Sequence, residues 1–216
     1  MRLNPAILAF DTSAAHCAAA LFTDAEVVAA RHEEVSKGQA ERLFPMLEQV
    51  LSEADLGWSA LDGIGVGTGP GNFTGIRIAI SAARGLALSL NVPAIGVNLF
   101  DALAFDAEGD VLLTLGAPRD AFYVQSRTGG EISEITVRDI SDLPSTPPNT
   151  TCIGVRSDEV AARLGLKRAP ARFAPASAIA RIAAQRLETT TDRPSPLYIR
   201  PANAAPSSEP SPVILP

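Results

Sequence analysis

The sequence predicts an α/β protein with two lobes in which one order of elements occurs twice. The first half reads as three strands, helix, strand, helix, and the same order begins again at Val111. A glycine-rich turn between an apolar strand and a long helix lies in the middle of the first half. We therefore expect an N-terminal lobe over 1–106, a reduced C-terminal lobe over 107–200 and a disordered Pro- and Ser-rich tail over 201–216.

The first four elements follow from apolar patterning. Short apolar runs predict strands over 6–10, 16–22 and 27–33. Apolar residues at helical spacing, opposite charged ones, predict an amphipathic helix over 40–54. Pro45 removes one backbone hydrogen bond there, so we expect a kink or a later helix start.

A strand over 64–66 then leads through glycines into a helix over 74–90, with Asn72 or Thr74 as its cap. The helix is apolar nearly all round, apart from a narrow stripe made by Arg77, Ser81 and Arg84. Such a helix must be buried on more than one side. Packing inside this chain and contact with another protein are both open explanations.

The remaining elements are predicted in the same way. A strand over 94–97 and a helix over 99–105 complete the first half, and Gly129 with Gly130 signals a hairpin in the second. The second half contains predicted strands over 111–115, 122–127, 131–137 and 152–155, and predicted helices over 158–164 and 176–187.

The glycine-rich turn resembles a phosphate-binding loop, because free N–H groups at a helix start favour an anion. The Walker pattern fails, since Gly75 is followed by Ile76 and Arg77. The dinucleotide fingerprint fails as well, because Thr74 takes the place of its third glycine. Nucleotide binding by this loop alone is the less favoured interpretation.

Composition limits the function. The net charge of −6 and pI near 5.0 argue against a protein that binds nucleic acid by itself. Arg77 and Arg84 interrupt the most apolar stretch and no signal peptide is recognisable, so we expect no membrane contact and a cytoplasmic location. Cys17 and Cys152 form no zinc motif and are expected to be buried thiols.

Little in the sequence points to catalysis. Asp11, Thr12 and Ser13 end the first strand and form either a phosphate or metal corner or an ordinary turn, and the turn is favoured. His16 and His32 are the only histidines, and there is no H-x-x-x-H or G-x-S-x-G motif. We predict no catalytic residue, no metal site and no cofactor.

Three segments resemble the TsaB (YeaZ) family of bacteria. They are ILAFDTSAAHCAAALF over 7–22, IGVGTGPGNFTGIRIAISAARGLAL over 64–88 and PLYIRP over 196–201. The resemblance implies the actin- and Hsp70-like ATPase fold (ASKHA), with two lobes of the order inferred above. It also makes Asp11, Thr12 and Ser13 a degenerate phosphate loop.

The resemblance implies a non-catalytic scaffold or activator subunit in the synthesis of tRNA N6-threonylcarbamoyladenosine. The implied partners are a TsaD-like catalytic subunit, which keeps the metal-binding histidines, and a TsaE-like ATPase. The complex moves threonylcarbamoyl from its adenylate, made by TsaC, to tRNA, which this chain would contact only through the complex.

The implied contact with TsaD uses the helices over 40–54 and 74–90, and the same face can pair two copies when the partner is absent. This resemblance explains the excess apolar surface of the second helix. The expected interface residues are Leu43, Phe44, Leu47, Leu51, Ile76, Arg77, Ile80, Ala83, Arg84 and Ala87.

The chain departs from the family at three places. It has Gln39-Ala40-Glu41-Arg42 where many members have His-Ser-Glu-Arg. It has Gly116-Ala117-Pro118-Arg119 and Ala121-Phe122-Tyr123 where they have Asp-Ala-Arg and Glu-Val-Tyr. The loss of acidic residues speaks against nucleotide or metal binding between the lobes. The alternative function is a small ATP-dependent sugar-kinase-like or peptidase-like enzyme that uses a cleft at Asp11.

Overall fold

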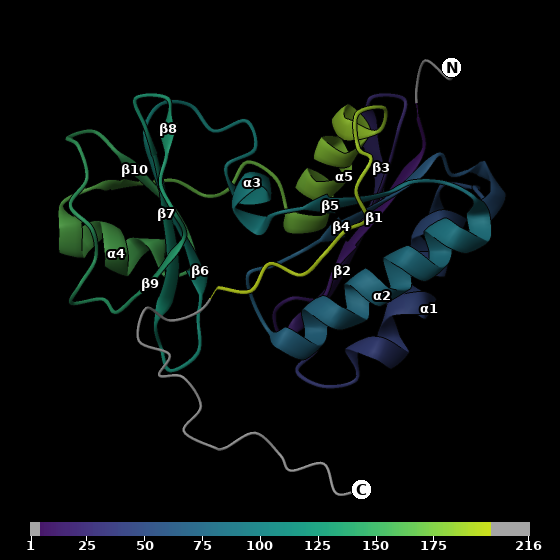
Figure 1. The fold of residues 1–216 in the computed structure, drawn as a ribbon, viewed down its shortest axis with the longest axis horizontal. Helices are drawn as coiled ribbons and strands as arrows, with labels where there is room; N and C mark the ends of the chain where they lie inside the picture. The colour runs from purple at the N-terminus through teal and green to yellow at the C-terminus, as the bar shows by residue number, and fades with distance from the viewer. Residues whose placement is uncertain (1–4, 200–216) are drawn as a thin grey trace, which may run out of the picture.

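The computed structural model describes residues 5–199, which form two β-sheets with helices on their faces (Figure 1). The first sheet has five strands in the order β3-β2-β1-β4-β5. Its strands are β1 (Ile7–Asp11), β2 (His16–Thr23), β3 (Glu26–Glu34), β4 (Gly63–Gly67) and β5 (Ala94–Val97). β1, β4 and β5 are parallel, whereas β2 and β3 run antiparallel to their neighbours.

Helices cover both faces of the first sheet. α1 (Gln39–Glu53) and α2 (Phe73–Leu90) share a core with Leu8 and Phe10 of β1. On the other face, α3 (Leu99–Leu103) and α5 (Pro175–Arg186) share a core with Ile7 and Ala9. β1 is therefore buried on both sides, which explains its uninterrupted apolar sequence. α5 lies in the range expected to form the second lobe, yet it packs against the first sheet.

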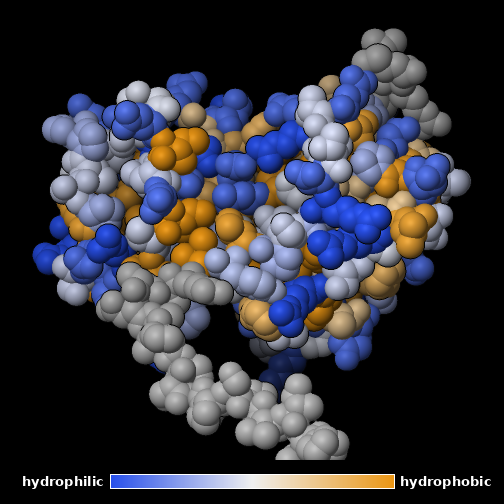
Figure 2. Space-filling view, viewed as in Figure 1, coloured by the Kyte–Doolittle hydropathy of each residue, from blue (hydrophilic) through white to orange (hydrophobic). Residues whose placement is uncertain are grey.

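The second sheet has the order β11-β10-β6-β7-β8, and β9 also pairs with β7. Its strands are β6 (Val111–Gly116), β7 (Phe122–Thr128), β8 (Glu131–Ile132), β9 (Thr136–Arg138), β10 (Thr151–Gly154) and β11 (Lys167–Arg168). α4 (Ser157–Leu164) contributes Val160 to a small core with Leu112 and Cys152. Figure 2 shows apolar side chains gathered over this sheet.

The predicted order of elements is confirmed, and the differences are local. The predicted strand over 131–137 is divided into β8 and β9, because the backbone N–H of Ser133 donates to Ser126 and its hydroxyl accepts from the Ser126 N–H. β11 and the 3-10 turn η1 (Trp58–Ala60) are too short for a periodic signal and were not predicted. The predicted tail over 201–216 lies outside the described residues.

Pro45 does not delay the start of α1, contrary to one of the two expectations. The helix begins at Gln39 and Pro45 lies inside it. Proline leaves the carbonyl of Glu41 without a helical donor, but both residues are exposed. Water can therefore satisfy this carbonyl.

α2 begins at its predicted cap, because the Asn72 side chain accepts a hydrogen bond from the Gly75 N–H at 3.0 Å. Among residues 5–199, α2 is the one helix apolar and long enough, by composition, to cross a membrane, with mean hydropathy 1.3. Arg77 and Arg84 therefore do not exclude a span, as the sequence had suggested. A core helix passes the same test, and α2 buries Ile76, Ala79 and Ile80 against this chain's own core.

Candidate functional site

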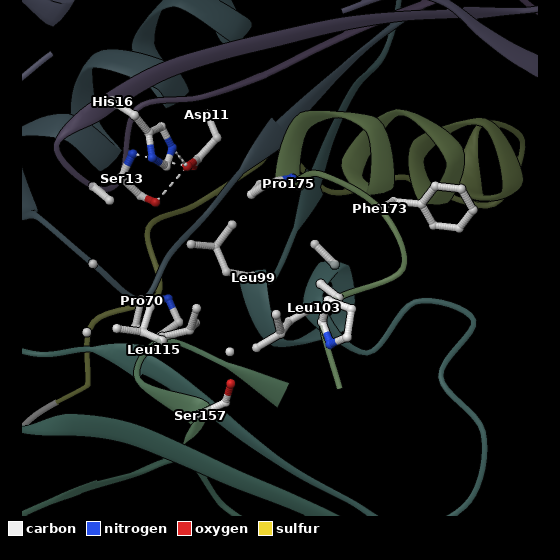
Figure 3. Close-up of a pocket in the computed structure, with 18 of the residues that line it drawn as sticks. Asp11, Ser13, His16, Pro70, Leu99, Leu103, Leu115, Ser157, Phe173 and Pro175 are labelled. Atoms are coloured by element: carbon white, nitrogen blue, oxygen red, sulfur yellow. Dashed lines mark hydrogen bonds and ion pairs between the residues drawn. The ribbon is translucent and has the colours of Figure 1, made fainter. Parts of the chain in front are cut away.

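The candidate site lies between the two sheets, where the parallel strands of both sheets end. Residues at or just after the carboxyl ends of these strands line one cavity of about 680 Å³ (Figure 3). The six strands that end there are β1, β4 and β5 of the first sheet and β6, β10 and β11 of the second. Crevices at the carboxyl ends of parallel strands are the usual ligand sites of α/β proteins.

Asp11 lies at one end of this cavity and is fully buried. Its Oδ2 accepts hydrogen bonds from the Ser13 hydroxyl at 2.8 Å and the Ser13 N–H at 3.3 Å, and lies 2.8 Å from His16 Nε2. Figure 3 shows these groups turned toward the carboxylate. Its Oδ1 is buried without a hydrogen-bond partner in the described part of the chain. The polar groups of the turn are thus directed at an internal carboxylate.

His16 was not predicted as a site residue. Burial by itself lowers the pKa of its imidazole, but the hydrogen bond to Asp11 and the charges of Asp11 and Glu34 outweigh burial. The pKa of His16 is therefore raised above its ordinary value. The sequence signal was its position five residues after Asp11, at the start of the strand that returns beside β1.

Thr12 and Ser13 pack directly against the glycine-rich turn. The Thr12 hydroxyl donates to the Gly75 carbonyl at 2.7 Å. A Cβ added at Gly75 would lie 1.8 Å from the Thr12 oxygen, and one at Gly71 would lie 2.3 Å from the Ser13 oxygen. These two glycines are therefore required for close packing of two backbones, which accounts for them without a phosphate.

The arrangement at Asp11 does not form a nucleophile. The Ser13 hydroxyl donates to Asp11, and His16 also contacts Asp11, so the carboxylate stands between the serine and the base. An activated serine needs its hydroxyl on the imidazole instead. Within residues 5–199 there is also no group of three His, Cys, Asp or Glu side chains placed to hold a metal ion.

The two cysteines are buried free thiols, as predicted. Burial raises the pKa of both Cys17 and Cys152 to about 11. Thiols held in their protonated form are poor nucleophiles at neutral pH.

Most of the predicted interface residues lie in the core of this chain. Leu43, Leu47, Leu51, Ile76, Ile80 and Ala83 are at most 3% exposed. They contact β1, β2 and β4 residues in one core cluster, so they are not available to a partner in this conformation. Of the other four predicted residues, Phe44 is 44% exposed, Arg77 and Arg84 are exposed, and Ala87 is half-buried.

The segment before residue 200 packs along α2, which sequence reasoning missed. Arg84 Nε donates to the Pro194 carbonyl and Arg77 Nε donates to the Tyr198 hydroxyl, both at 2.9 Å. The rings of Phe73 and Tyr198 are stacked with centroids 5.0 Å apart. The PLYIRP motif was the available signal. The polar stripe of α2 thus binds this chain's own C-terminal segment.

Residues 25–193 match the family model described as "TsaD: tRNA N6-adenosine threonylcarbamoyltransferase". TsaB of Escherichia coli K12 is 37% identical over 98 residues, which are 45% of this chain and 42% of the relative. An uncharacterized protein of Mycobacterium leprae is 32% identical over 165 residues, which are 74% of this chain and 45% of the relative. The chain thus matches less than half the length of these relatives.

Solved structures give the fold. An uncharacterized Pseudomonas aeruginosa protein with similarity to peptidase YEAZ has a TM-score of 0.74 at 26% identity, over 91% of this chain and 100% of that one. Component A of the Acidaminococcus fermentans (R)-2-hydroxyglutaryl-CoA dehydratase has a TM-score of 0.55 at 10% identity, over 86% of this chain and 100% of that one.

The likeness to component A of the dehydratase, at 10% identity, concerns the fold alone. With the two mixed sheets, it confirms the predicted fold class of actin- and Hsp70-like ATPases. The chain belongs to the family that the TsaD model describes, and its named relatives identify it as a member of the TsaB (YeaZ) family.

Proposed function

We propose that this chain is a non-catalytic subunit in the synthesis of tRNA N6-threonylcarbamoyladenosine, acting in the cytoplasm as a scaffold for a TsaD-like catalytic subunit. Several relatives carry the name "tRNA threonylcarbamoyladenosine biosynthesis protein TsaB", which supports the pathway. In this proposal a TsaE-like ATPase and tRNA meet the chain only within the complex.

One observation carries the non-catalytic part of the proposal. Phosphate loops bind their anion through N–H and hydroxyl donors. At the Asp11 turn, the Ser13 N–H and hydroxyl donate to the Asp11 carboxylate instead. A phosphate would have to displace a buried negative charge from its own donors, which makes this turn a poor site for ATP.

The exposed surface supports a revised partner contact. Large apolar side chains remain exposed on α1, α2 and the segment that covers α2, namely Phe44 at 44%, Phe73 at 52%, Leu88 at 84% and Tyr198 at 45%. Aromatic and arginine side chains dominate the binding energy of many interfaces. We therefore propose that Phe44, Phe73, Arg77 and Leu88 contact the TsaD-like subunit, or a second copy of this chain when that subunit is absent.

Coexpression with the TsaD of the same organism tests the proposal. Size-exclusion chromatography of the wild type is expected to show a complex, and the Phe44→Glu, Phe73→Glu double variant is expected to lose it. Ile132→Glu is the matched control, because Ile132 is 60% exposed on β8 of the other sheet. Circular dichroism checks that each free chain is folded.

Two results would count against the proposal. If wild-type chains form no complex, the scaffold function is wrong; if the double variant binds like wild type, only the contact surface is wrong. Stoichiometric ATP binding by the isolated chain would instead favour the alternative, a small kinase-like or peptidase-like enzyme that uses the Asp11 cleft.

A further inference from the structure

The cavity between the sheets has an apolar middle. Its walls come from α3, from the ends of β6 and β10, and from the segment that precedes α5. Apolar side chains in these walls include Leu99, Leu103, Leu115, Val155 and Phe173. A volume of about 680 Å³ lies within the range of pockets that enclose a small organic molecule.

The end of the cavity opposite the Asp11 turn carries Ser157, a largely buried residue whose hydroxyl has no partner among the described residues. Ser157 is the first residue of α4 and only 9% exposed. Its hydroxyl makes no hydrogen bond to any described residue, and Figure 3 shows it pointing into the cavity. The hydroxyl oxygen is open to the cavity, so Ser157 can still donate and accept a hydrogen bond there.

The start of α4 has no side-chain cap either. Arg156 occupies the cap position with φ 51° and provides no capping hydrogen bond. Its guanidinium contacts Asp120 and Glu159 instead, both at 2.6 Å. The first N–H groups of α4 therefore keep their preference for an anion.

Arg168 is an exposed residue that also lines this cavity. It lies on β11, whose pairing sets Arg168 beside Cys152 of β10, the strand that leads to Ser157. Arg168 has no ion pair among residues 5–199. The acidic residues of the first turn of α4, Asp158 and Glu159, are exposed, and Glu159 is paired with Arg156.

We infer that this cavity binds a compact apolar molecule with a single oxyanionic group, which Ser157, Arg168 and the start of α4 hold while the apolar walls enclose its body. The inference is independent of the proposed function, because it involves neither the exposed surface of α1 and α2 nor a partner. A nucleotide fits less well, since its several phosphate charges would approach the buried Asp11 carboxylate. Arg168 is the one arginine or lysine among the described residues that line the cavity.

Titration of the full chain tests the inference, with 3-phenylpropionate as the probe and 3-phenylpropanol as its uncharged counterpart. Calorimetry or ligand-detected NMR is expected to show saturable binding of the acid and much weaker binding of the alcohol. Arg168→Gln is expected to weaken binding of the acid by about tenfold or more, and Ser157→Ala by severalfold, since hydrogen bonds to charged groups are strong. Arg163→Gln is the control, because Arg163 is exposed on the last turn of α4 and does not line the cavity.

Phenyl phosphate and ADP extend the experiment. Tighter binding of phenyl phosphate than of 3-phenylpropionate, lost in the same two variants, would support the site and assign its head group as a phosphate monoester. The inference is overturned if the alcohol binds as tightly as the acid, if both variants bind like wild type, or if ADP displaces the acid as the stronger ligand. Thermal melts of each variant establish that loss of binding does not reflect loss of fold.

Discussion

Arg77 donates a hydrogen bond to the hydroxyl of Tyr198 at 2.9 Å, across 121 positions of sequence. The same guanidinium lies 3.8 Å from the centre of the Phe73 ring, which stacks on Tyr198. An arginine and two aromatic rings thus fasten the C-terminal segment to the start of α2.

This cluster predicts a graded effect of substitutions at Tyr198. Tyr198→Ala loses the ring stack and the hydrogen bond and is expected to lower the free energy of unfolding by about 1 kcal/mol. Tyr198→Phe keeps the stack and is expected to cost about half as much or less, because the bond is exposed to water. Urea denaturation measures both. Equal stability of Tyr198→Ala and wild type would show that the segment is not held by this cluster.

Two glycines of α2 predict effects of opposite sign. Gly75→Ala sets a methyl group 1.8 Å from the Thr12 carbonyl oxygen and is expected to destabilise the chain by about 3 kcal/mol or more. Gly85→Ala meets no atom within 4 Å and is expected to stabilise it by about 0.5–1 kcal/mol, because alanine favours the helix. Thermal and urea unfolding of the two variants provide the comparison. A Gly75→Ala protein as stable as wild type would be incompatible with the contact between the two turns.

The core and surface positions of α1 predict different stabilities. Leu47 is fully buried, so Leu47→Ala is expected to reduce the free energy of unfolding by about 2–5 kcal/mol. Phe44→Ala is expected to change it by less than about 1 kcal/mol, since that side chain is 44% exposed. Denaturation of the isolated chain measures both. A larger loss of stability in Phe44→Ala than in Leu47→Ala would instead favour Leu47 as an interface residue.

The contact between His16 and Asp11 predicts a pH dependence. The pKa of His16 is higher in the folded chain than in the unfolded one, so protonation favours the folded state. This contribution is fully present below the unfolded pKa of about 6.5 and is lost as pH rises through the higher folded value. We expect unfolding experiments between about pH 5.5 and 8.5 to show this loss in wild type and not in His16→Gln. If the free energy of unfolding depends on pH in the same way in wild type and in His16→Gln, the raised pKa of His16 is contradicted.

Periodicity predicted most of the fold because the strands and helices of the first sheet are long and strongly patterned. The two-residue strands β8 and β11 carry no period, so only pairing with β7 and β10 defines them. The packing of α5 against the first sheet could not be predicted from the sequence for a different reason. Its apolar stripe predicts that one face of the helix is buried. The path of the chain determines against which sheet that face packs.

The candidate site was only partly predictable. The Asp11 turn was recognised because it follows a strand, but Ser157 and Arg168 come together through the order of strands in the second sheet. Core and interface residues on α2 were confused because the helix is apolar nearly all round, and hydrophobicity alone does not say which face meets the sheet. Three predicted interface residues of α2, namely Ile76, Ile80 and Ala83, therefore lie in the core, as do Leu43, Leu47 and Leu51 of α1.

The packing of α5 on the first sheet makes the two halves of the chain interdependent. The chain leaves the first sheet after α3, builds the second sheet and returns to the first at α5, so two covalent connections join the sheets before α5 begins. A fragment that ended before Val111 would expose Ile7, Ala9 and Ile95 to water, because Ile179 and its neighbours would no longer cover them. Any opening between the sheets must bend both connections at once, which couples the width of the cavity to the position of α5.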